Sequence, residues 1–456
     1  MESAMRMRDS VVGRRRVRRA VAGSALGVLL LLTGASPAAA TGDPSGPGWW
    51  ARQLARQPLA AADGWAASGA GTTGGSAADD AHVFVARNRD ELAAALTGAE
   101  PKIVFVEGVI DGLKTADGTA LTCADLADPG YTLESYLAAY DPAVWGRATD
   151  PSGPIEQARV RSVANQRART ELKVGPNTTV LGLGDATLRH LTLMIDGGNN
   201  VIVRNLNFED AADCFPRWRP TDGAEGNWNS EYDLVSVRRS TNVWIDHNTF
   251  SDGDNPDSNQ PVYFGRPWQV HDGACDITHT SDLVTVSANV FTHHDKTMLI
   301  GSSDTVGPDV GKLRVTLRHN IFDGVGQRAP RVRFGQVDVY NNTFRIAEFY
   351  DYSVGLGIQS AVYLENNHFT LTDGITADRV LKDWKGTAVT ERGSFGRVGN
   401  GRPGPLNLLA AYNTAHDPDF GADAGWTPTL RAYQPLPGWA VPLATLLSGA
   451  GRLGAR

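Results

Sequence analysis

Acidic side chains that could act together are concentrated in the middle of the chain. Asp272 and Asp276 lie close together in the sequence, and Asp233 precedes Asp272 by 39 residues. On a straight strand Asp272 and Asp276 would be ~13 Å apart, but Gly273 suggests a bend that would bring both carboxylates toward one point. Such oxygen donors suit Ca²⁺, whereas no Cys/His spacing indicates zinc. Solvated aspartates in turns are the alternative, and they are the commoner case.

Four positively charged side chains follow in the same region. Lys296 ends the motif His-His-Asp-Lys, and Arg328, Arg331 and Arg333 share one short segment. Pro330 has no backbone donor for a β-ladder, so this segment should turn at the edge of a sheet. An exposed basic run is usually just a solvated face. Three guanidinium groups and a lysine near a candidate Ca²⁺ site instead favour the binding of an anion.

A repeated pattern indicates which elements position these side chains. Short β-branched runs end in the signature Asn-x-Phe at residues 248–250, 289–291, 320–322, 342–344 and 367–369. Counted from an earlier variant at Phe208, the phenylalanines are 42, 41, 31, 22 and 25 residues apart. The shortest intervals match one coil of a parallel β-solenoid, and the longer ones require loop insertions. Stacked coils would place Asn above Asn in a hydrogen-bonded ladder and Phe above Phe inside, so the pattern predicts a parallel β-helix.

Other all-β folds fit the pattern less well. A β-sandwich should show hairpin signals such as Asn-Gly, which are nearly absent, and a propeller should show a regular four-strand blade. Residues 113–170 interrupt the strands with helical material at 133–140 and 155–169, and we expect this insertion to cover one end of the solenoid. Residues 376–456 lose the rhythm, and we expect them to pack back along the solenoid or to cap its C-terminal end.

The first 40 residues differ from the rest of the chain. Seven Arg and two acidic residues precede the apolar stretch Val21–Thr33 and a small-residue site at Ala38–Ala40. This order is typical of a secretory signal peptide, and the apolar stretch is shorter than the ~20 residues that span a bilayer. We therefore expect a secreted, extracellular protein with no membrane anchor after signal removal. Residues 41–80 are then an Ala/Gly-rich loose arm, and residues 81–456 form the β-helix domain.

Charge and cysteine content set two further limits. The chain carries a formal charge of −7, and because residues 1–40 contribute +5, the remainder carries −12. This excludes general nucleic-acid binding, which requires a basic surface, but a polyanion could still bind in a local basic groove. The three cysteines are Cys123, Cys214 and Cys275. At least one thiol is unpaired within the chain, the pairing stays open, and Cys275 is best interpreted as a small buried filler.

These motifs resemble those of the secreted pectate lyases of polysaccharide lyase family 1, which are right-handed parallel β-helices. The motifs that carry the resemblance are Trp244–His247, His271–Gly273, Lys296, Gly301–Asp304 and Arg328–Gly335. Three further segments, Phe215–Trp218, Thr221–Gly223 and Asn227–Asn229, resemble the alkaline bacterial branch of that family. The likeness covers roughly residues 68–450, and the helical insertion resembles an elaboration found only in some members.

The resemblance implies roles for individual residues. The primary Ca²⁺ ligands of the family correspond to Asp233, Asp272 and Asp276. The catalytic base corresponds to Arg328, and two substrate-binding residues correspond to Lys296 and Arg333. Glu231 stands where some members have an Asp that helps to bind additional Ca²⁺, and whether it has this role stays open.

The activity implied is Ca²⁺-dependent β-elimination in α-1,4-linked polygalacturonate, carried out by a monomer. A base removes the proton on C5, the C4–O bond breaks, and a 4,5-unsaturated uronate remains. The metal would bridge the aspartates and the sugar carboxylate, acting as Lewis acid and template. Arginine is ordinarily always protonated, so a neutral Arg328 would require neighbouring positive charge and an alkaline medium.

Three other functions compete with this interpretation. A pectin lyase acts on methyl-esterified polymer without Ca²⁺ and should lack the three aspartates, which are all present here. A β-helix glycosidase could use the same carboxylates as acid and base, but its Lys and Arg residues would then have no role. A solenoid that only binds cell-wall polysaccharide is permitted by fold analogy, although it would be expected to have lost one of the named groups.

Overall fold

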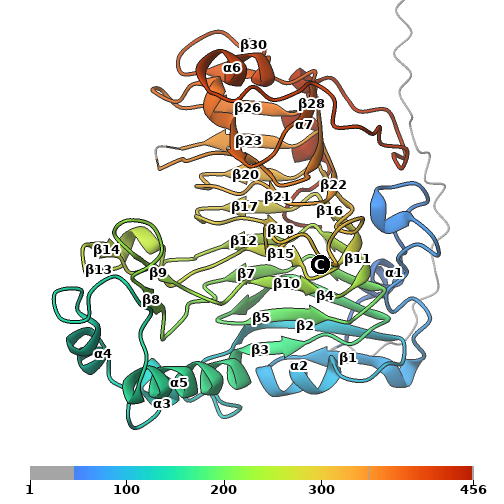
Figure 1. Cartoon of the computed structure of the whole chain (residues 1–456). Helices are drawn as coiled ribbons and strands as arrows, with labels where there is room; N and C mark the ends of the chain where they lie inside the picture. Colours follow the sequence, from blue (N-terminus) through green and yellow to red (C-terminus); the bar gives the residue numbers. More distant parts are fainter. Residues whose placement is uncertain (1–45, 348, 454–456) are drawn as a thin grey trace, which may run out of the picture. The chain divides into compact units, whose positions relative to one another are not determined.

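The computed structural model describes residues 46–347 and 349–453. The predicted signal peptide, residues 1–40, lies outside the described residues. Short parallel strands coil repeatedly into a right-handed parallel β-helix (Figure 1), which confirms the fold that the repeat pattern predicted. No helix in the described part of the chain is both long and apolar enough to cross a membrane.

Three walls of parallel strands form the solenoid. The first wall is an eight-stranded sheet of β3 (Glu171–Lys173), β5 (Thr192–Asp196), β10 (Val235–Arg238), β15 (Cys275–Thr278), β18 (Leu299–Ile300), β21 (Arg331–Val332), β24 (Val354–Gly357) and β27 (Leu381–Trp384). The second wall contains β1 (Val83–Ala86), β2 (Lys102–Asp111), β4 (Thr178–Arg189), β6 (Val201–Arg204), β11 (Thr241–Asp246), β16 (Asp282–Ser287), β19 (Val315–Arg318), β22 (Gln336–Tyr340), β25 (Ala361–Glu365) and β28 (Val389–Arg392). The third wall contains β7 (Asn207–Glu209), β12 (Thr249–Ser251), β17 (Val290–Thr292), β20 (Ile321–Asp323), β23 (Thr343–Ile346), β26 (His368–Leu371) and β29 (Phe395–Val398). The long strand β4 pairs with both β6 and β7 and so belongs to the second and third walls together.

A ladder of buried asparagines fixes the turn between the second and third walls. Its members are Asn248, Asn289, Asn320, Asn342 and Asn367, all fully buried. The side-chain amides of the first four each donate to the Oδ1 of the Asn in the next coil, at 2.9–3.1 Å. Because a buried amide without partners is costly, the ladder holds successive coils in one register. The predicted Asn ladder is therefore confirmed.

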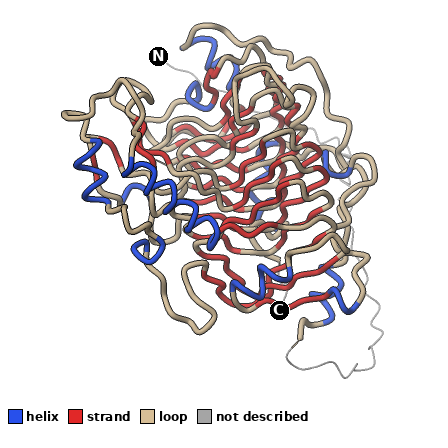
Figure 2. The backbone as a smooth tube through the Cα atoms, turned by 60° about the horizontal axis from the view of Figure 1, so that its bottom comes forward, coloured by secondary structure: helices blue, strands red, loops and turns tan. Residues whose placement is uncertain are grey.

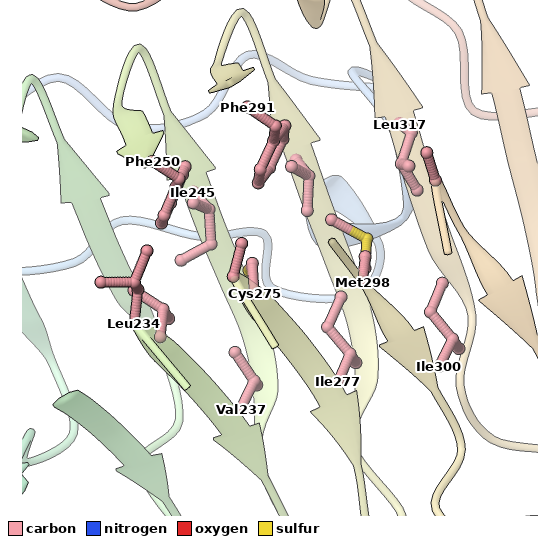
Figure 3. Close-up of a cluster of buried hydrophobic side chains, with 14 of the residues drawn as sticks. Leu234, Val237, Ile245, Phe250, Cys275, Ile277, Phe291, Met298, Ile300 and Leu317 are labelled. Atoms are coloured by element: carbon pink, nitrogen blue, oxygen red, sulfur yellow. The ribbon is translucent and has the colours of Figure 1, made fainter. Parts of the chain in front are cut away.

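Stacked aromatic rings fill the interior beside this ladder. Phe208, Phe250, Phe291, Phe322, Phe344 and Phe369 form one continuous column with ring centroids 4.5–5.1 Å apart. Figure 3 shows part of this core, in which Cys275 lies among Leu234, Ile277 and other apolar side chains. Its thiol is free and buried, as expected for a small core residue.

The helical insertion has the helices that the sequence predicted. They are α3 (Cys123–Leu126), α4 (Leu133–Tyr140) and α5 (Pro154–Thr170). The Cys123–Cys214 disulfide joins this insertion to the segment that carries β8 (Arg217–Arg219) and β9 (Asn227–Asn229). Together with β13 (Val262–Tyr263) and β14 (Arg266–Pro267) they enclose a second apolar core, which contains Tyr136, Trp218 and Trp228.

The helical insertion does not cover the N-terminal end of the solenoid. In Figures 1 and 2 the insertion helices flank the side of the first coils, near β3. The end of the solenoid core is instead covered by α2 (Arg89–Ala95), whose Leu92 is fully buried in the main core with Leu96 just after it. The expectation that residues 113–170 cover the end is thus corrected, because the short helix before β2 already fills that position.

Residues 46–80 were expected to belong to a loose arm, but the structure places them against the second wall. They contain α1 (Trp49–Ala55), η1 (Trp65–Ala67) and the residue that begins η2 (Asp80–His82). The backbone N–H groups of Trp65 and Ala66 donate to Thr316 and Thr285, each at 3.0 Å. The Ala/Gly-rich composition permits this close backbone approach.

The C-terminal region continues the solenoid for one more coil before it leaves it. β27, β28 and β29 pair in parallel with β24, β25 and β26, so the rhythm persists to Val398. The Asn-x-Phe signature is absent from this coil, because Ser394 and Gly396 stand at the positions of the Asn and the Phe. A Cβ on Gly396 would lie 1.8 Å from the carbonyl oxygen of Phe369.

After this coil the chain returns along the solenoid, as predicted. The elements beyond β29 are β30 (Gly404–Pro405), α6 (Leu408–Ala415), η5 (Gly438–Ala440) and α7 (Val441–Leu447), with η4 (Ala377–Val380) just before β27. The Nε1 of Trp426 donates to Ala361 at 2.9 Å, and the backbone N–H of Gly451 donates to Ala288 at 2.8 Å. The tail therefore runs from the last coils back to the middle of the second and third walls.

Candidate functional site

Strand register in the first wall brings the predicted site residues together. Val235 pairs with Cys275, which places Asp233 beside Gly273 in the next coil. Parallel bridges then join Gly273 to Lys296 and Lys296 to Gln327. Four successive coils thus carry the aspartates, the lysine and the Arg328 segment to one point on the outer face of the sheet.

Two of the carboxylates converge on Gly273. Oδ1 of Asp233 accepts a hydrogen bond from the Gly273 N–H at 2.9 Å, and Oδ1 of Asp276 accepts one from the Leu299 N–H at 2.8 Å. A Cβ on Gly273 would lie 2.3 Å from Oδ1 of Asp276 and 2.7 Å from Oδ1 of Asp233. The glycine is therefore required here to leave room for both carboxylates.

The third carboxylate faces the basic groups. Oδ1 of Asp272 lies 3.6 Å from Nζ of Lys296 and 3.9 Å from Nη1 of Arg328. The structure thus brings together five of the six residues to which the resemblance assigns a role. Arg333 lies one short strand further along, directly after β21.

The three carboxylates destabilise one another's charge. Burial raises the pKa of Asp233 well above its usual value, and repulsion by Asp276 and Asp272 raises it further. Burial, followed by repulsion from Asp272, raises the pKa of Asp276 to about 7. A cluster with too much negative charge and only oxygen donors is of the chemical type that binds a hard divalent cation such as Ca²⁺.

The carboxylates do not form a closed metal shell by themselves. Within residues 46–347 and 349–453, no three His, Cys, Asp or Glu side chains are placed to hold a metal ion. A Ca²⁺ ion takes six to eight oxygens, so the aspartates would have to be completed by oxygens from water or from a bound carboxylate.

Arg328 is held in an unusual conformation beside the cluster. Its backbone φ is +59°, a left-handed value that is uncommon for a residue other than glycine. Its Nε is buried and has no hydrogen-bond partner among the described residues. Burial lowers the pKa of the guanidinium, but Asp272 and Asp276 outweigh this, and the pKa of Arg328 is raised overall. The carboxylates therefore favour the protonated form.

Two buried histidines position Asp272 and Lys296. Nε2 of His294 lies 2.9 Å from the carbonyl oxygen of Asp272 and 3.1 Å from that of Lys296, which ties the two coils together. His271 is hydrogen bonded to Asp210 at 2.9 Å and to Asp257 at 3.1 Å, the latter in η3 (Asp257–Asn259). Both imidazole rings are thus occupied by hydrogen-bond partners within the protein. No local pattern in the sequence indicates the acidic partners of His271.

Asp304 holds Arg333, and the sequence assigned it no role. Nε of Arg333 donates to Asp304 at 2.6 Å, and Nη1 donates to the Gly301 carbonyl at 2.8 Å. Asp304 also accepts a hydrogen bond from Lys385 at 2.6 Å. Its place in the motif Gly301–Asp304 was the available signal, whereas Lys385 comes from a distant coil and could not be found this way.

Glu231 lies near the cluster but is paired elsewhere. Its carboxylate is 3.1 Å from Nη2 of Arg167, which also binds Glu171 at 2.8 Å. A cavity of about 200 Å³ is lined by Glu231, Asp233 and Ser236, among other residues. Glu231 therefore shares a cavity with one of the aspartates while its charge is offset by α5.

Comparison with known proteins connects this site to a family. A family model described as pectate lyase matches residues 50–127 and 148–403. The pectate lyase of Bacillus subtilis strain 168 is 41% identical over 396 residues, which cover 84% of this chain and 90% of that protein. Pectate lyase D of Dickeya chrysanthemi is 36% identical over 358 residues, which cover 75% of this chain and 80% of that protein.

Solved structures of pectate lyases are similar to this chain as well. The thermostable pectate lyase PL 47 is 42% identical with a TM-score of 0.85, and the match covers 88% of this chain and 99% of that chain. A pectate lyase bound to hexasaccharide is 39% identical with a TM-score of 0.81, and the match covers 88% of this chain and 100% of that one.

The matched stretches contain the carboxylate cluster, both basic segments and all the coils between them. The interval without a match, residues 128–147, contains α4, which makes this helix the part of the insertion that departs from the family model. Because the family match extends over most of the solenoid and the relatives are alike over most of their length, this chain belongs to the pectate lyase family and is an enzyme of the polysaccharide lyase class.

Proposed function

We propose that the protein is a Ca²⁺-dependent pectate lyase that cleaves α-1,4-linked polygalacturonate by β-elimination. The observation that carries this proposal is the meeting of three carboxylates with Lys296 and Arg328 on adjacent coils. A polyanionic substrate requires positive charge in its groove, and a carboxylate cluster beside that charge suits a cation that bridges enzyme and substrate. Elimination forms the 4,5-unsaturated product without consuming water or a second substrate.

In this proposal Asp233, Asp272 and Asp276 are the metal ligands. Bound Ca²⁺ would supply Lewis-acid polarisation of the substrate carboxylate and would offset the carboxylate charge that otherwise keeps Arg328 protonated. Gly273 and the Leu299 N–H hold two of these carboxylates in place.

The basic residues act on the sugar chain itself. Lys296 and Arg333 bind substrate carboxylates, and Asp304 fixes the orientation of the Arg333 fork. Arg328 removes the C5 proton, and the electrons of the C5–H bond form the C4–C5 double bond. The C4–O bond breaks, its electron pair stays on the oxygen of the departing sugar, and that oxygen takes a proton from solvent to become a hydroxyl. The left-handed backbone of Arg328 and its unpartnered Nε leave the guanidinium available for this step.

We further propose an extracellular location and the domain limits predicted from the sequence. Residues 1–40 are the secretory signal peptide and residues 81–456 the lyase domain, which acts as a monomer on pectate. Residues 46–80 belong structurally to the same body, because they pack on its second wall.

Product absorbance tests the proposed function. The protein is incubated with polygalacturonate in Ca²⁺ and, in parallel, in excess chelator, and ultraviolet absorbance of the conjugated product is followed. We expect product only with Ca²⁺, and restored activity when Ca²⁺ is added back. Methyl-esterified polymer is the matched control substrate, and it should be cleaved poorly. Full activity in chelator, or cleavage without the unsaturated product, would contradict the proposal and favour a pectin lyase or a glycosidase.

A further inference from the structure

One peptide group connects two of the proposed metal ligands. It joins Asp272 to Gly273, and its N–H donates to Oδ1 of Asp233 at 2.9 Å. Its carbonyl oxygen accepts a hydrogen bond from Nε2 of His294 at 2.9 Å, the one bond that this oxygen accepts among the described residues. The C=O and N–H of a peptide lie in one plane and point in opposite directions. The orientation that His294 gives to the carbonyl is therefore also the orientation in which the N–H meets Asp233.

His294 holds the lysine of the site with the same hydrogen. Its Nε2 lies 3.1 Å from the carbonyl oxygen of Lys296, so one N–H is shared between two carbonyl groups. Both neighbours of Nε2 are acceptors, so this nitrogen carries the hydrogen. The N–H of Asp272 makes a long bond of 3.3 Å to Tyr232, and Gly273 has no side chain to restrict rotation of the backbone. The ring of His294 is thus a main restraint on this peptide.

Asp252 determines which nitrogen of the ring faces the carbonyl groups. Oδ1 of Asp252 is paired with Nδ1 of His294, and both residues are 2% exposed. A buried carboxylate without a partner is costly, so Asp252 keeps Nδ1 turned toward itself and Nε2 toward the peptide. Its Oδ2 lies 3.7 Å from Nδ1 of His271, which places the carboxylate between two imidazole rings.

Strand pairing brings these residues together from different coils. Asp252 directly follows β12, and His294 is the second residue after β17. The two strands pair with Phe250 opposite Phe291, so residues 42 apart in the sequence become neighbours. The turn that leaves the third wall therefore supports the site that lies at the start of the first-wall strands, and the functions assigned above give Asp252 no role.

We propose that His294, oriented by Asp252, is a positioning residue that sets the placement of Asp233, Asp272 and Lys296 relative to one another. It touches neither metal nor substrate and acts through the peptide carbonyl of Asp272. This inference rests on the proposed function, because it takes the two aspartates as Ca²⁺ ligands and Lys296 as a substrate-binding residue. Groups that hold metal ligands in place typically contribute about tenfold to 100-fold in metal affinity.

The Ca²⁺ affinity of the substrate-free protein tests the role of the ring. Calorimetric titration with Ca²⁺ compares the wild type with His294→Asn and His294→Gln. The Gln amide can place a donor close to the position of Nε2, whereas the shorter Asn amide reaches only the position of Nδ1. We expect the Kd to rise about tenfold to 100-fold in His294→Asn and by less than about threefold in His294→Gln. His293→Asn is the matched control and should bind like the wild type, because this neighbouring ring is exposed and contacts Thr292.

Two further measurements distinguish positioning from a general structural role. Asp252→Ala should raise the Kd for Ca²⁺ about tenfold in the wild type but add little to His294→Asn, because Asp252 acts through the ring. In excess Ca²⁺, Asp252→Ala and His294→Asn should raise KM for polygalacturonate more than they lower kcat, because the groups that react are untouched. If circular dichroism shows that His294→Asn is unfolded, Asp252→Ala decides the question, and an unchanged Kd in that variant overturns the proposal.

The outcomes separate this proposal from the proposed function. A wild-type Kd in His294→Asn, or equal losses in His294→Asn and His294→Gln, would overturn the positioning role while the lyase function stands. A double variant whose loss is the product of the two single losses would overturn it as well. If the wild type binds Ca²⁺ but forms no unsaturated product, the lyase function fails, and the Kd values still decide whether the ring positions the aspartates. A wild type that binds no Ca²⁺ would overturn both.

Discussion

Replacing Asp276 by Asn should make the metal-free protein more stable while it removes the response to Ca²⁺. Asp276 is 6% exposed, and its Oδ1 accepts a hydrogen bond from the Leu299 N–H at 2.8 Å. An Asn side chain has the same size and keeps an acceptor oxygen for that bond. The substitution therefore removes a charge from the cluster without leaving a cavity or an unpaired backbone donor.

The size of the effect follows from the raised pKa. In the folded protein the pKa of Asp276 rises from 3.8 to about 7, so folding takes up a proton between these values and the free energy of unfolding falls as the pH rises through this window. Above pH 7 the ionised carboxylate destabilises the metal-free fold by at most ~4 kcal/mol. With ~2.1 cal/mol/K of unfolding entropy per residue, a body of roughly 400 residues gains about 1 °C in Tm per kcal/mol. Asp276→Asn should thus raise the Tm in chelator at pH 8 by ~2–4 °C.

Thermal unfolding at several pH values and Ca²⁺ concentrations measures both effects. The wild type should gain ~3 kcal/mol at Ca²⁺ concentrations of about 100 Kd, and the variant should gain much less. The difference in chelator should disappear near pH 4, where the wild-type carboxyl is protonated. Asp323→Asn is the control, because this carboxylate is 38% exposed and paired with Arg345. A variant that is less stable than the wild type in chelator at pH 8, or that keeps the full Ca²⁺ response, would refute the reasoning.

Two further predictions concern the basic residues and the ladder. Arg328→Lys should lower kcat by about 10²–10⁴-fold with little change in KM, because general-base catalysis contributes that much. Arg333→Lys should instead mainly raise KM. Steady-state kinetics followed by product absorbance distinguish the two variants, and a near-wild-type kcat in Arg328→Lys would remove Arg328 from the base role. Asn320→Ala should lower the free energy of unfolding by ~2–4 kcal/mol, because it leaves buried groups of both neighbouring coils unpaired. Chemical denaturation measures this loss. Asn207→Ala is the control, because the Asn207 side chain makes only a long hydrogen bond of 3.5 Å to Thr187 among the described residues. Equal losses of stability in the two variants would contradict the role of the ladder.

The sequence was sufficient to predict the solenoid, because its coils repeat. Within the ladder an Asn amide is satisfied by the Asn of the next coil, and within the column a Phe packs on the Phe of the next, so the same residues recur from turn to turn. The one coil it missed, β27 to β29, lacks both residues of the signature. There Ser394 and Gly396 leave the strand pairing intact and remove only the pattern.

The sequence also placed the candidate site residues in one region, since Asp272 and Asp276 are near neighbours and Arg328 and Arg333 share a segment. The sequence did not reveal which distant residues contact these side chains or which cysteines pair. Asp304 reaches Arg333 across 29 residues, and the Cys123–Cys214 disulfide closes 91 residues. Neither separation has a local pattern that would reveal the contact.

Tertiary structure alone decided which distant residues share the outer face of the first wall. Lys382 and Trp384 follow Asp276 by more than 100 residues, yet parallel pairing brings them onto the same outer face as Arg331. In a solenoid, neighbours in space are residues one coil apart, and the loops between strands set how many residues one coil contains. The repeat therefore encodes the stacking, while the loop lengths, which follow no period, decide which side chains meet.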